Sequence, residues 1–116
     1  MHYILWHNPR CSKSRAALAL LRDRGVEFEV RDYLKEPPHC AEIEALATAL
    51  GGPVKAMMRT GEPEYAELDL DAPGVTDAAL YAAMAGHPRL IERPILVRGE
   101  RAVIGRPPER VLELLG

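Results

Sequence analysis

The stretch Tyr3–Arg15 reads YILWHNPRCSKSR and decides the start of the fold. Its first four residues are a short apolar run that His-Asn-Pro ends, which is typical of a buried strand. Residues 12–24 follow with apolar side chains at helical spacing, and Gly25 stands where a helix C-terminal cap belongs. The stretch therefore predicts a strand and a helix, joined by a loop that carries Cys11.

Apolar and charged residues alternate after this helix. Val26, Phe28 and Val30 are interleaved with charged side chains, and this period of two predicts a second strand. A strand, a helix and a strand in this order indicate a βαβ unit with two parallel strands and a right-handed crossover.

The middle of the chain has the spacing of helices. Apolar residues recur at helical spacing up to Gly51, a short helical piece covers Val54–Met58, and Thr76 is placed to cap a helix that ends near Ala85. Residues 61–75, interrupted by prolines, are expected to be mostly irregular.

The C-terminal part predicts a hairpin and a final helix. Two short apolar runs, Ile95–Val97 and Ala102–Ile104, flank a turn that contains glycine. Pro107-Pro108 then opens the helix, since a proline in the first turn lacks only an N–H that would have no partner there. The residues expected on the inner face of this helix are Val111, Leu112 and Leu115.

These elements predict an α/β fold of the thioredoxin-like class, in the order βαβ…ββα, with a four-stranded mixed sheet covered by helices. A helical insertion at about residues 38–88 separates the two halves. Because the 116-residue chain has no internal repeat or linker, a single domain over residues 1–116 is expected.

Composition argues against several classes of function. The 15 basic and 17 acidic residues give a net charge of −2, without the basic footprint of a nucleic-acid-binding protein. No apolar run is long enough to cross a membrane and no signal peptide is recognised, so we expect a cytoplasmic protein. Cys11 and Cys40 lack the spacing of a disulfide framework or a metal site.

Cys11 is the strongest candidate for chemistry. It lies between the first predicted strand and helix, where the N–H groups and the dipole of a helix N-terminus favour an anion. Arg10, Lys13 and Arg15 add positive charge, so we expect a lowered thiol pKa and a reactive thiolate. Because Ser14 stands in place of a second cysteine, a redox cycle would need an outside reductant.

The segment His7–Ser14, which reads His-Asn-Pro-x-Cys-x-x-Ser, resembles the opening motif of the glutaredoxin-dependent arsenate reductase family. Further segments resemble that family's motifs in the same order; they are residues 33–38, 57–60, 87–95 and 105–107. The resemblance therefore covers almost the whole chain.

The resemblance implies roles for particular residues. Cys11 matches the family's nucleophile, and Pro94 matches a cis-proline that faces the active site. The arginines that match residues around the oxyanion are Arg59, Arg93 and Arg106. His7 and Ser14 match residues that help to position or activate the thiolate. Arginine forks suit a tetrahedral oxyanion such as arsenate.

The resemblance also implies a reaction. The Cys11 thiolate attacks arsenate to give a thio-arsenate adduct, glutathione attacks next, glutaredoxin resolves the mixed disulfide, and arsenite leaves. Glutathione is then a co-substrate and no cofactor or metal is bound. The enzyme is expected to act as a monomer, with no nucleic-acid or membrane partner.

Two other functions stay open at this stage. One is a related monothiol, glutathione-linked oxidoreductase with another substrate, because a fold and a thiol do not determine a substrate. The other is a non-enzymatic thiol-stress regulator that binds RNA polymerase. Ser14 argues against this function, because that group typically has Cys-x-x-Cys.

Cys40 lies outside the motifs and is expected to be a bystander. His39 stands where the family usually has a Ser or Thr helix cap.

Overall fold

The computed structural model describes residues 2–115, which divide into two compact units. The first unit is built from both ends of the chain, up to Glu36 and from Arg93 onward, and the second is Pro37–Glu92. The insertion expected at about residues 38–88 lies inside the second unit. The single-domain organisation stays a prediction, and the two units are described separately below.

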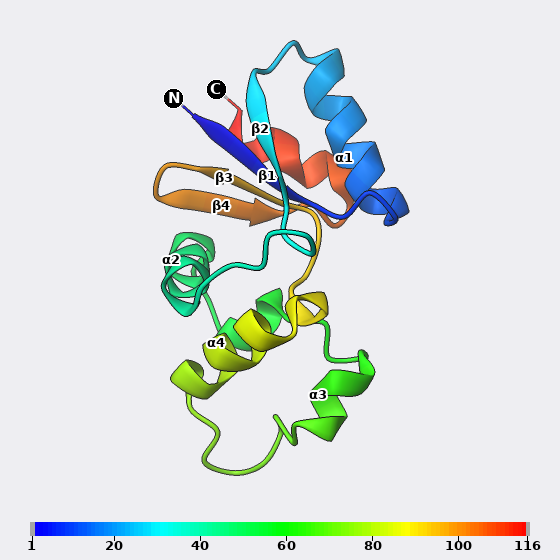
Figure 1. Ribbon diagram of the computed structural model, residues 1–116. Helices are drawn as coiled ribbons and strands as arrows, with labels where there is room; N and C mark the ends of the chain where they lie inside the picture. The colour runs from blue at the N-terminus through cyan, green and yellow to red at the C-terminus, as the bar shows by residue number, and fades with distance from the viewer. Residues whose placement is uncertain (1, 116) are drawn as a thin grey trace. The chain divides into compact units, whose positions relative to one another are not determined.

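The first unit contains the sheet, helix α1 and a C-terminal 3₁₀ helix (Figure 1). These elements are β1 (Tyr3–His7), α1 (Ser12–Asp23), β2 (Phe28–Asp32), β3 (Ile95–Arg98), β4 (Arg101–Ile104) and a 3₁₀ helix (Pro108–Leu114). The strand order is β2-β1-β3-β4, with β1 parallel to β2 and antiparallel to β3, and β3 antiparallel to β4. The predicted α/β fold with a four-stranded mixed sheet is confirmed.

One face of this sheet forms the core of the first unit. Leu5 of β1 lies opposite Leu96 of β3, which lies opposite Val103 of β4, so the three side chains share a face. Helix α1 and the C-terminal 3₁₀ helix pack against each other over the same core. The buried members of this cluster are Leu5, Ala17, Leu21, Leu96, Val103, Val111 and Leu114. Burial of this apolar surface is the main force that holds β1 and α1, and so the loop between them, in place.

The opposite face of β1 presents Trp6. Its ring lies 6.0 Å from that of Tyr33, and the guanidinium of Arg31 lies 5.3 Å from its centroid, within the range of a cation–π contact. Only 5% of Trp6 is exposed to solvent. Val30, in contrast, is exposed, because β2 is at the edge of the sheet and the alternation of its residues does not bury that position.

The last helix differs from the prediction. It is a 3₁₀ helix, and its buried residues are Val111 and Leu114, whereas Leu112 and Leu115 are only partly buried. A 3₁₀ helix has three residues per turn, so residues i and i+3 share a face. The expected inner face is confirmed at Val111, but it left out Leu114, because it assumed the 3.6 residues per turn of an α-helix.

The second unit is helical and contains no strand among its described residues 37–92. Its elements are α2 (Cys40–Leu50), a 3₁₀ helix (Val54–Met57), α3 (Pro63–Glu67), α4 (Asp77–Gly86) and a 3₁₀ helix (Pro88–Leu90). Helices α2 and α4 pack together. As predicted, the Thr76 hydroxyl caps α4 by accepting the Ala79 N–H at 3.2 Å. The segment expected to be irregular contains α3, because Pro63 occupies the first turn, where proline is favourable.

Helix α2 begins without a hydroxyl cap. The Glu42 carboxylate accepts the His39 N–H at 3.1 Å, which is one half of a capping box. A carboxylate in the first turn also suits the helix dipole.

Among residues 2–115, no helix has the length and apolar character needed to cross a bilayer.

Candidate active site

Cys11 is the residue that precedes α1, and the backbone around it is fixed by the side chain and carbonyl of Asn8. The Cys11 N–H donates to the Asn8 carbonyl at 3.0 Å, and the Arg10 N–H donates to Asn8 Oδ1 at 3.0 Å. Asn8 is buried and Cys11 is partly exposed. The loop therefore turns around a buried amide and presents the thiol at the N-terminus of the helix.

Groups from two distant segments act on the thiol of Cys11. Its partial burial disfavours the thiolate, but hydrogen bonds from the backbone of Ser14 and Lys13 and from the side chain of Arg93 outweigh this effect. The result is that the pKa of the Cys11 thiol lies below its ordinary value. The direction of this shift is the one expected for a thiol at a helix N-terminus.

Arg106 links the thiol to the segment around Arg93. Its Nη2 lies 3.8 Å from Cys11 Sγ, and its Nε donates to the Arg93 carbonyl at 2.8 Å. The two arginines are 13 residues apart in the chain, on either side of the β3–β4 hairpin. The hairpin therefore brings both guanidinium-bearing segments to the one cysteine.

His7 and Ser14 form a buried pair beside the loop. His7 Nδ1 and Ser14 Oγ are 2.7 Å apart, and the same hydroxyl accepts the Asn8 N–H at 3.0 Å. Burial lowers the pKa of His7, with nearby Asp32 opposing and Arg15 adding to the shift. These surroundings favour the neutral imidazole, and the hydroxyl connects the end of β1 to the first turn of α1.

Pro94 is fully buried, and the Arg93–Pro94 bond is cis, as is Arg106–Pro107. The Pro94 carbonyl accepts the Gly105 N–H at 2.8 Å. A Cβ atom on Gly105 would lie 2.8 Å from Pro94 Cγ and 3.0 Å from Val111 Cγ1, which is closer than carbon atoms pack. Gly105, which has no side chain, therefore lets the segment before Pro107 pack directly against Pro94.

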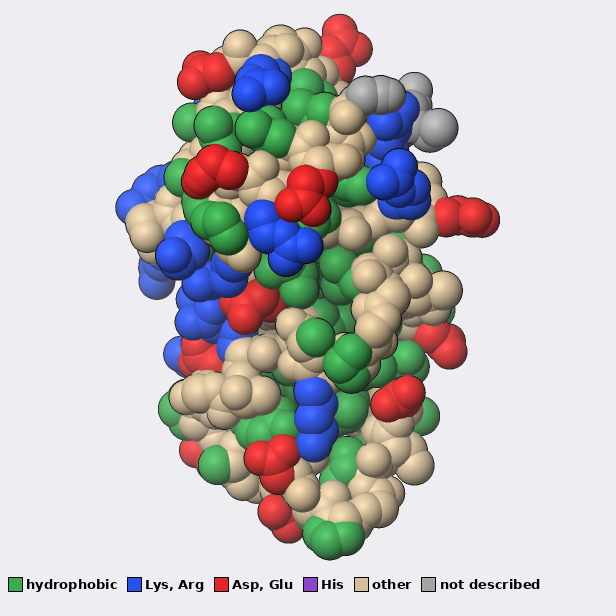
Figure 2. All heavy atoms as spheres, turned by 180° about the vertical axis from the view of Figure 1, so that it is seen from behind, with side chains coloured by type: hydrophobic (Ala, Val, Ile, Leu, Met, Phe, Trp, Pro, Cys, Tyr) green, Lys and Arg blue, Asp and Glu red, His purple; other side chains and the backbone are tan. Residues whose placement is uncertain are grey.

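Positive charge gathers where α1 begins. Arg10, Lys13 and Arg15 are all exposed, and Lys and Arg side chains cluster in this region in the space-filling view (Figure 2). Arg15 also donates from Nη1 to the Pro9 carbonyl at 3.0 Å. An anion that approaches Cys11 within the first unit therefore meets a local positive field on a chain whose net charge is −2.

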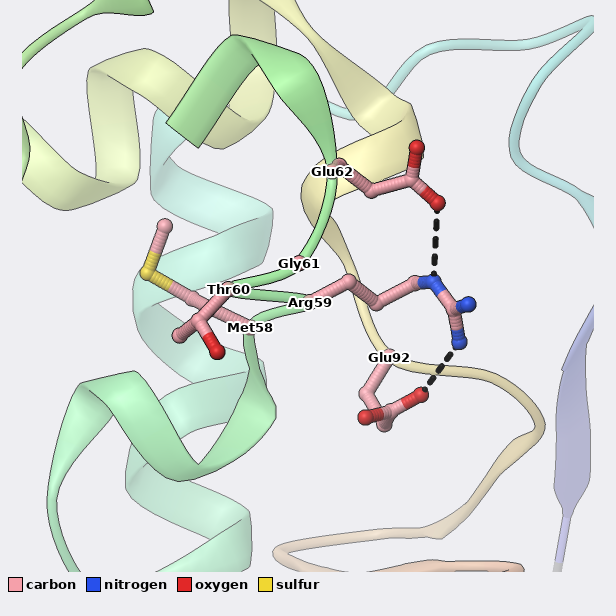
Figure 3. A pocket seen from close by; sticks show the side chains of 6 residues that line it. All are labelled: Met58, Arg59, Thr60, Gly61, Glu62 and Glu92. Atoms are coloured by element: carbon pink, nitrogen blue, oxygen red, sulfur yellow. Dashed lines mark hydrogen bonds and ion pairs between the residues drawn. The ribbon is translucent and has the colours of Figure 1, made fainter. Parts of the chain in front are cut away.

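Arg59 belongs to the second unit, and its surroundings are different. Its Nε donates to Glu62 at 3.2 Å and its Nη1 donates to Glu92 at 2.9 Å (Figure 3). These residues line an open pocket with Met58, Thr60 and Gly61. The sequence did not indicate the Glu92 partner, because Glu92 is 33 residues from Arg59 and only the tertiary fold pairs them. It did not single out Glu62 either, although Glu62 is only three residues from Arg59.

Comparison with known proteins shows the family of the chain. A model of the ArsC family matches residues 6–114. The chain belongs to the ArsC family. It is similar to the arsenate reductase of Haemophilus influenzae, with 45% identity over 99% of this chain and 100% of that protein. It is also similar to the uncharacterized protein YfgD of Escherichia coli, with 47% identity over 97% of this chain and 95% of that protein.

A solved structure extends the comparison to the fold. The arsenate reductase from Vibrio cholerae is 49% identical and superimposes with a TM-score of 0.96, over 99% of this chain and 98% of that one. The thioredoxin-like fold predicted for this ArsC family member is therefore confirmed, together with the family resemblance.

The structure brings most of the predicted site residues of this ArsC protein into one unit. Those in the first unit are His7, Cys11, Ser14, Arg93, Pro94 and Arg106. Arg59 lies in the second unit, as does Cys40, which is exposed at the start of α2. No group of three or more potential metal ligands occurs among residues 2–115. The roles of the site residues stay predictions.

Proposed function

We propose that this protein reduces arsenate to arsenite, with Cys11 as the nucleophile. The observation that carries the proposal is the Cys11 thiol itself, which has a lowered pKa and lies 3.8 Å from a guanidinium nitrogen of Arg106. A thiolate next to arginine N–H groups is suited to attack a tetrahedral oxyanion. The names of the Haemophilus influenzae and Vibrio cholerae relatives support the same substrate.

The proposed chemistry has three steps. The Cys11 thiolate forms a bond to arsenic(V), and an arsenate oxygen leaves as water after it takes up protons. A glutathione thiolate then attacks Cys11 Sγ and breaks the sulfur–arsenic bond. The electron pair of that bond stays on arsenic, which leaves as arsenite, and the two sulfur atoms form a mixed disulfide. A glutaredoxin thiol finally takes the glutathionyl group and releases the Cys11 thiolate.

Protein groups have defined tasks in this scheme. The Ser14 and Lys13 backbone N–H groups stabilise the thiolate before attack and after release. Arg93 and Arg106 stabilise the negative charge on the arsenate oxygens as it shifts in the transition state. Ser14 Oγ and His7 keep the end of β1 joined to the first turn of α1. We further propose that the protein is cytoplasmic, since glutathione and glutaredoxin act in reducing compartments. We also propose that it acts as a monomer.

The test is arsenate-dependent NADPH oxidation in the presence of glutathione, glutaredoxin and glutathione reductase. Wild-type protein is compared with Cys11→Ser, and Cys40→Ser is the matched control, because Cys40 is an exposed thiol of the other unit. Turnover that is lost in Cys11→Ser and kept in Cys40→Ser is the expected result. No turnover by folded wild-type protein with several glutaredoxins would contradict the proposal.

A second candidate function is a related monothiol, glutathione-linked oxidoreductase with another substrate. The observation that favours it is the engagement of Arg59 by Glu62 and Glu92, because carboxylates compete with an oxyanion for the same guanidinium. Reduction of glutathionylated peptides by Cys11, in the absence of arsenate turnover, would support this alternative.

A further inference from the structure

Arg59 is held between two carboxylates from different parts of the chain. Glu62 follows it by three residues and accepts from Nε, while Glu92 comes from the end of the second unit and accepts from Nη1. In Figure 3 the two carboxylates lie against the same end of the Arg59 side chain. Glu62 also accepts from Arg89 Nη2 at 3.1 Å, so it is shared between two guanidinium groups.

The backbone holds Glu92 in this position. Met58 and Ile91 form an antiparallel bridge. On either side of that bridge, the Arg59 N–H donates to the Leu90 carbonyl at 2.7 Å and the Glu92 N–H donates to the Met57 carbonyl at 2.8 Å. This register places Arg59 opposite Leu90 and Glu92 opposite Met57. Arg59 and Glu92 are therefore diagonal neighbours on one face of the bridge, within reach of each other's long side chains.

The ion pairs are partly withdrawn from solvent. The exposed fractions of the side chains are 25% for Arg59, 14% for Glu62 and 19% for Glu92. Burial alone would lower the pKa of Arg59, but the hydrogen bonds and charges of the two carboxylates outweigh it and raise that pKa above its ordinary value. Charges in such surroundings are screened less than surface pairs.

The geometry of the guanidinium limits how another anion is bound. An oxyanion is gripped by two neighbouring N–H groups, either on the Nε–Nη2 edge or on the Nη1–Nη2 edge. Glu62 takes Nε and Glu92 takes Nη1, so each edge already has one nitrogen bonded to a carboxylate. Full capture of an oxyanion by Arg59 therefore requires a carboxylate to give way.

We infer that Glu92 and Glu62 compete with the oxyanion substrate for Arg59, and that Glu92 is a specificity-determining residue that weakens oxyanion binding. This inference rests on the proposed function and on the oxyanion-binding role that the family resemblance implies for Arg59. The pocket of about 370 Å³ lined by Arg59, Glu62 and Glu92 has room for a small tetrahedral anion.

The test is Glu92→Gln, which keeps the size of the side chain and removes its charge. Glu64→Gln is the matched control, since Glu64 is similarly buried and lies 4.0 Å from Arg89. Binding of sulfate and of arsenate is measured by calorimetry on full-length protein that also carries Cys11→Ser. We expect Glu92→Gln to lower the Kd for both anions roughly three- to tenfold relative to Glu64→Gln.

Two further measurements separate competition from a structural role. In the Arg59→Ala background, Glu92→Gln is expected to bring no gain in affinity, because the contested guanidinium is absent. In protein with Cys11 intact, Glu92→Gln is expected to lower the KM for arsenate by the same factor and to leave kcat within about twofold. Thermal melts show whether each variant is folded.

Three outcomes would overturn the inference. The first is an equal effect of Glu92→Gln and Glu64→Gln, which would leave only a general charge effect. The second is weaker anion binding by Glu92→Gln, as in Arg59→Ala, which would make Glu92 a residue that orients the guanidinium for substrate. The third is that no variant binds either anion. Sulfate binding needs no turnover, so a failure of arsenate reduction is distinguished from a failure of this competition.

Discussion

The arginines of the two units meet different acceptors. In the first unit, Arg106 donates to the Cys11 sulfur and to the Arg93 carbonyl. In the second unit, Arg59 donates to the carboxylates of Glu62 and Glu92. Arg106 and Arg59 have the same predicted role, but their side chains have different partners. The Arg106 guanidinium is directed at the reactive sulfur, whereas the charge of Arg59 is compensated by two carboxylates. The difference indicates that arginine count alone does not measure how strongly a site binds an oxyanion.

The largest expected effect that tests this comparison comes from Arg93→Ala. Loss of its hydrogen bond and charge should raise the pKa of Cys11 and reduce kcat/KM for arsenate about a hundredfold or more. Arg59→Ala should cost only about tenfold, mainly through KM, because carboxylates already compete for that guanidinium. The measurements are steady-state kinetics and the pH dependence of Cys11 alkylation by iodoacetamide.

Thermal melts provide the control for Arg93→Ala. The substitution is expected to reduce turnover far more than folding stability, and Arg93→Lys should recover part of the thiol pKa shift because it keeps the charge. If stability and turnover fall together, Arg93 is structural. If Arg59→Ala is as damaging as Arg93→Ala, the contrast between the two units is wrong.

A smaller effect is expected from Gly105→Ala. The new Cβ would lie 2.8 Å from Pro94 Cγ, and such overpacking lowers the free energy of unfolding by about 1–3 kcal/mol. Gly86→Ala in the second unit is the matched control, because a Cβ atom there meets nothing within 4 Å. Urea unfolding measures both. An unchanged midpoint for Gly105→Ala would show that the Pro94 segment relaxes freely.

The smallest expected effect concerns His7 and acid. Burial lowers its pKa in the folded protein, so the unfolded chain binds the proton first as the pH falls below about 6.5. Stability from the neutral imidazole is therefore complete above that pH and is lost below it. His7→Gln should make stability less sensitive to pH on the acid side, as measured by urea unfolding at pH 5 and pH 7. An identical pH dependence in the variant would contradict this origin.

The sequence predicted the elements of the first unit well because their signals are local. The alternation at Val26–Val30 and the two apolar runs of the hairpin each lie within a few residues, and β2, β3 and β4 are found there. The apolar alternation did not show that β2 would be an edge strand, which leaves Val30 exposed, since strand order depends on distant segments. The choice between α and 3₁₀ geometry at Pro108–Leu114 likewise depends on packing over the core.

The candidate site was predictable to a different extent in the two units. The loop around Cys11 carries a recognisable motif, and the groups that lower the Cys11 pKa include the backbone N–H groups of Lys13 and Ser14, which follow it closely in the chain. Arg59 was identified by its segment, but its partners Glu62 and Glu92 were not, because charged pairs leave no periodic pattern in the sequence. The short helix α3 was also not predicted. Pro63 is compatible both with the end of a helix and with its first turn, and the local sequence does not distinguish the two.

The packing around Trp6 supplies an optical probe of the site. Trp6 is the single tryptophan of the chain, only 5% of the residue is exposed to solvent, and it directly precedes His7. Its emission is therefore expected near the blue end of the tryptophan range in the native protein. Fluorescence excited at the indole band then follows the strand that leads directly into the Cys11 loop, in unlabelled protein and in real time. Adduct formation at the thiol and unfolding of the first unit are expected to differ in intensity change and in wavelength shift.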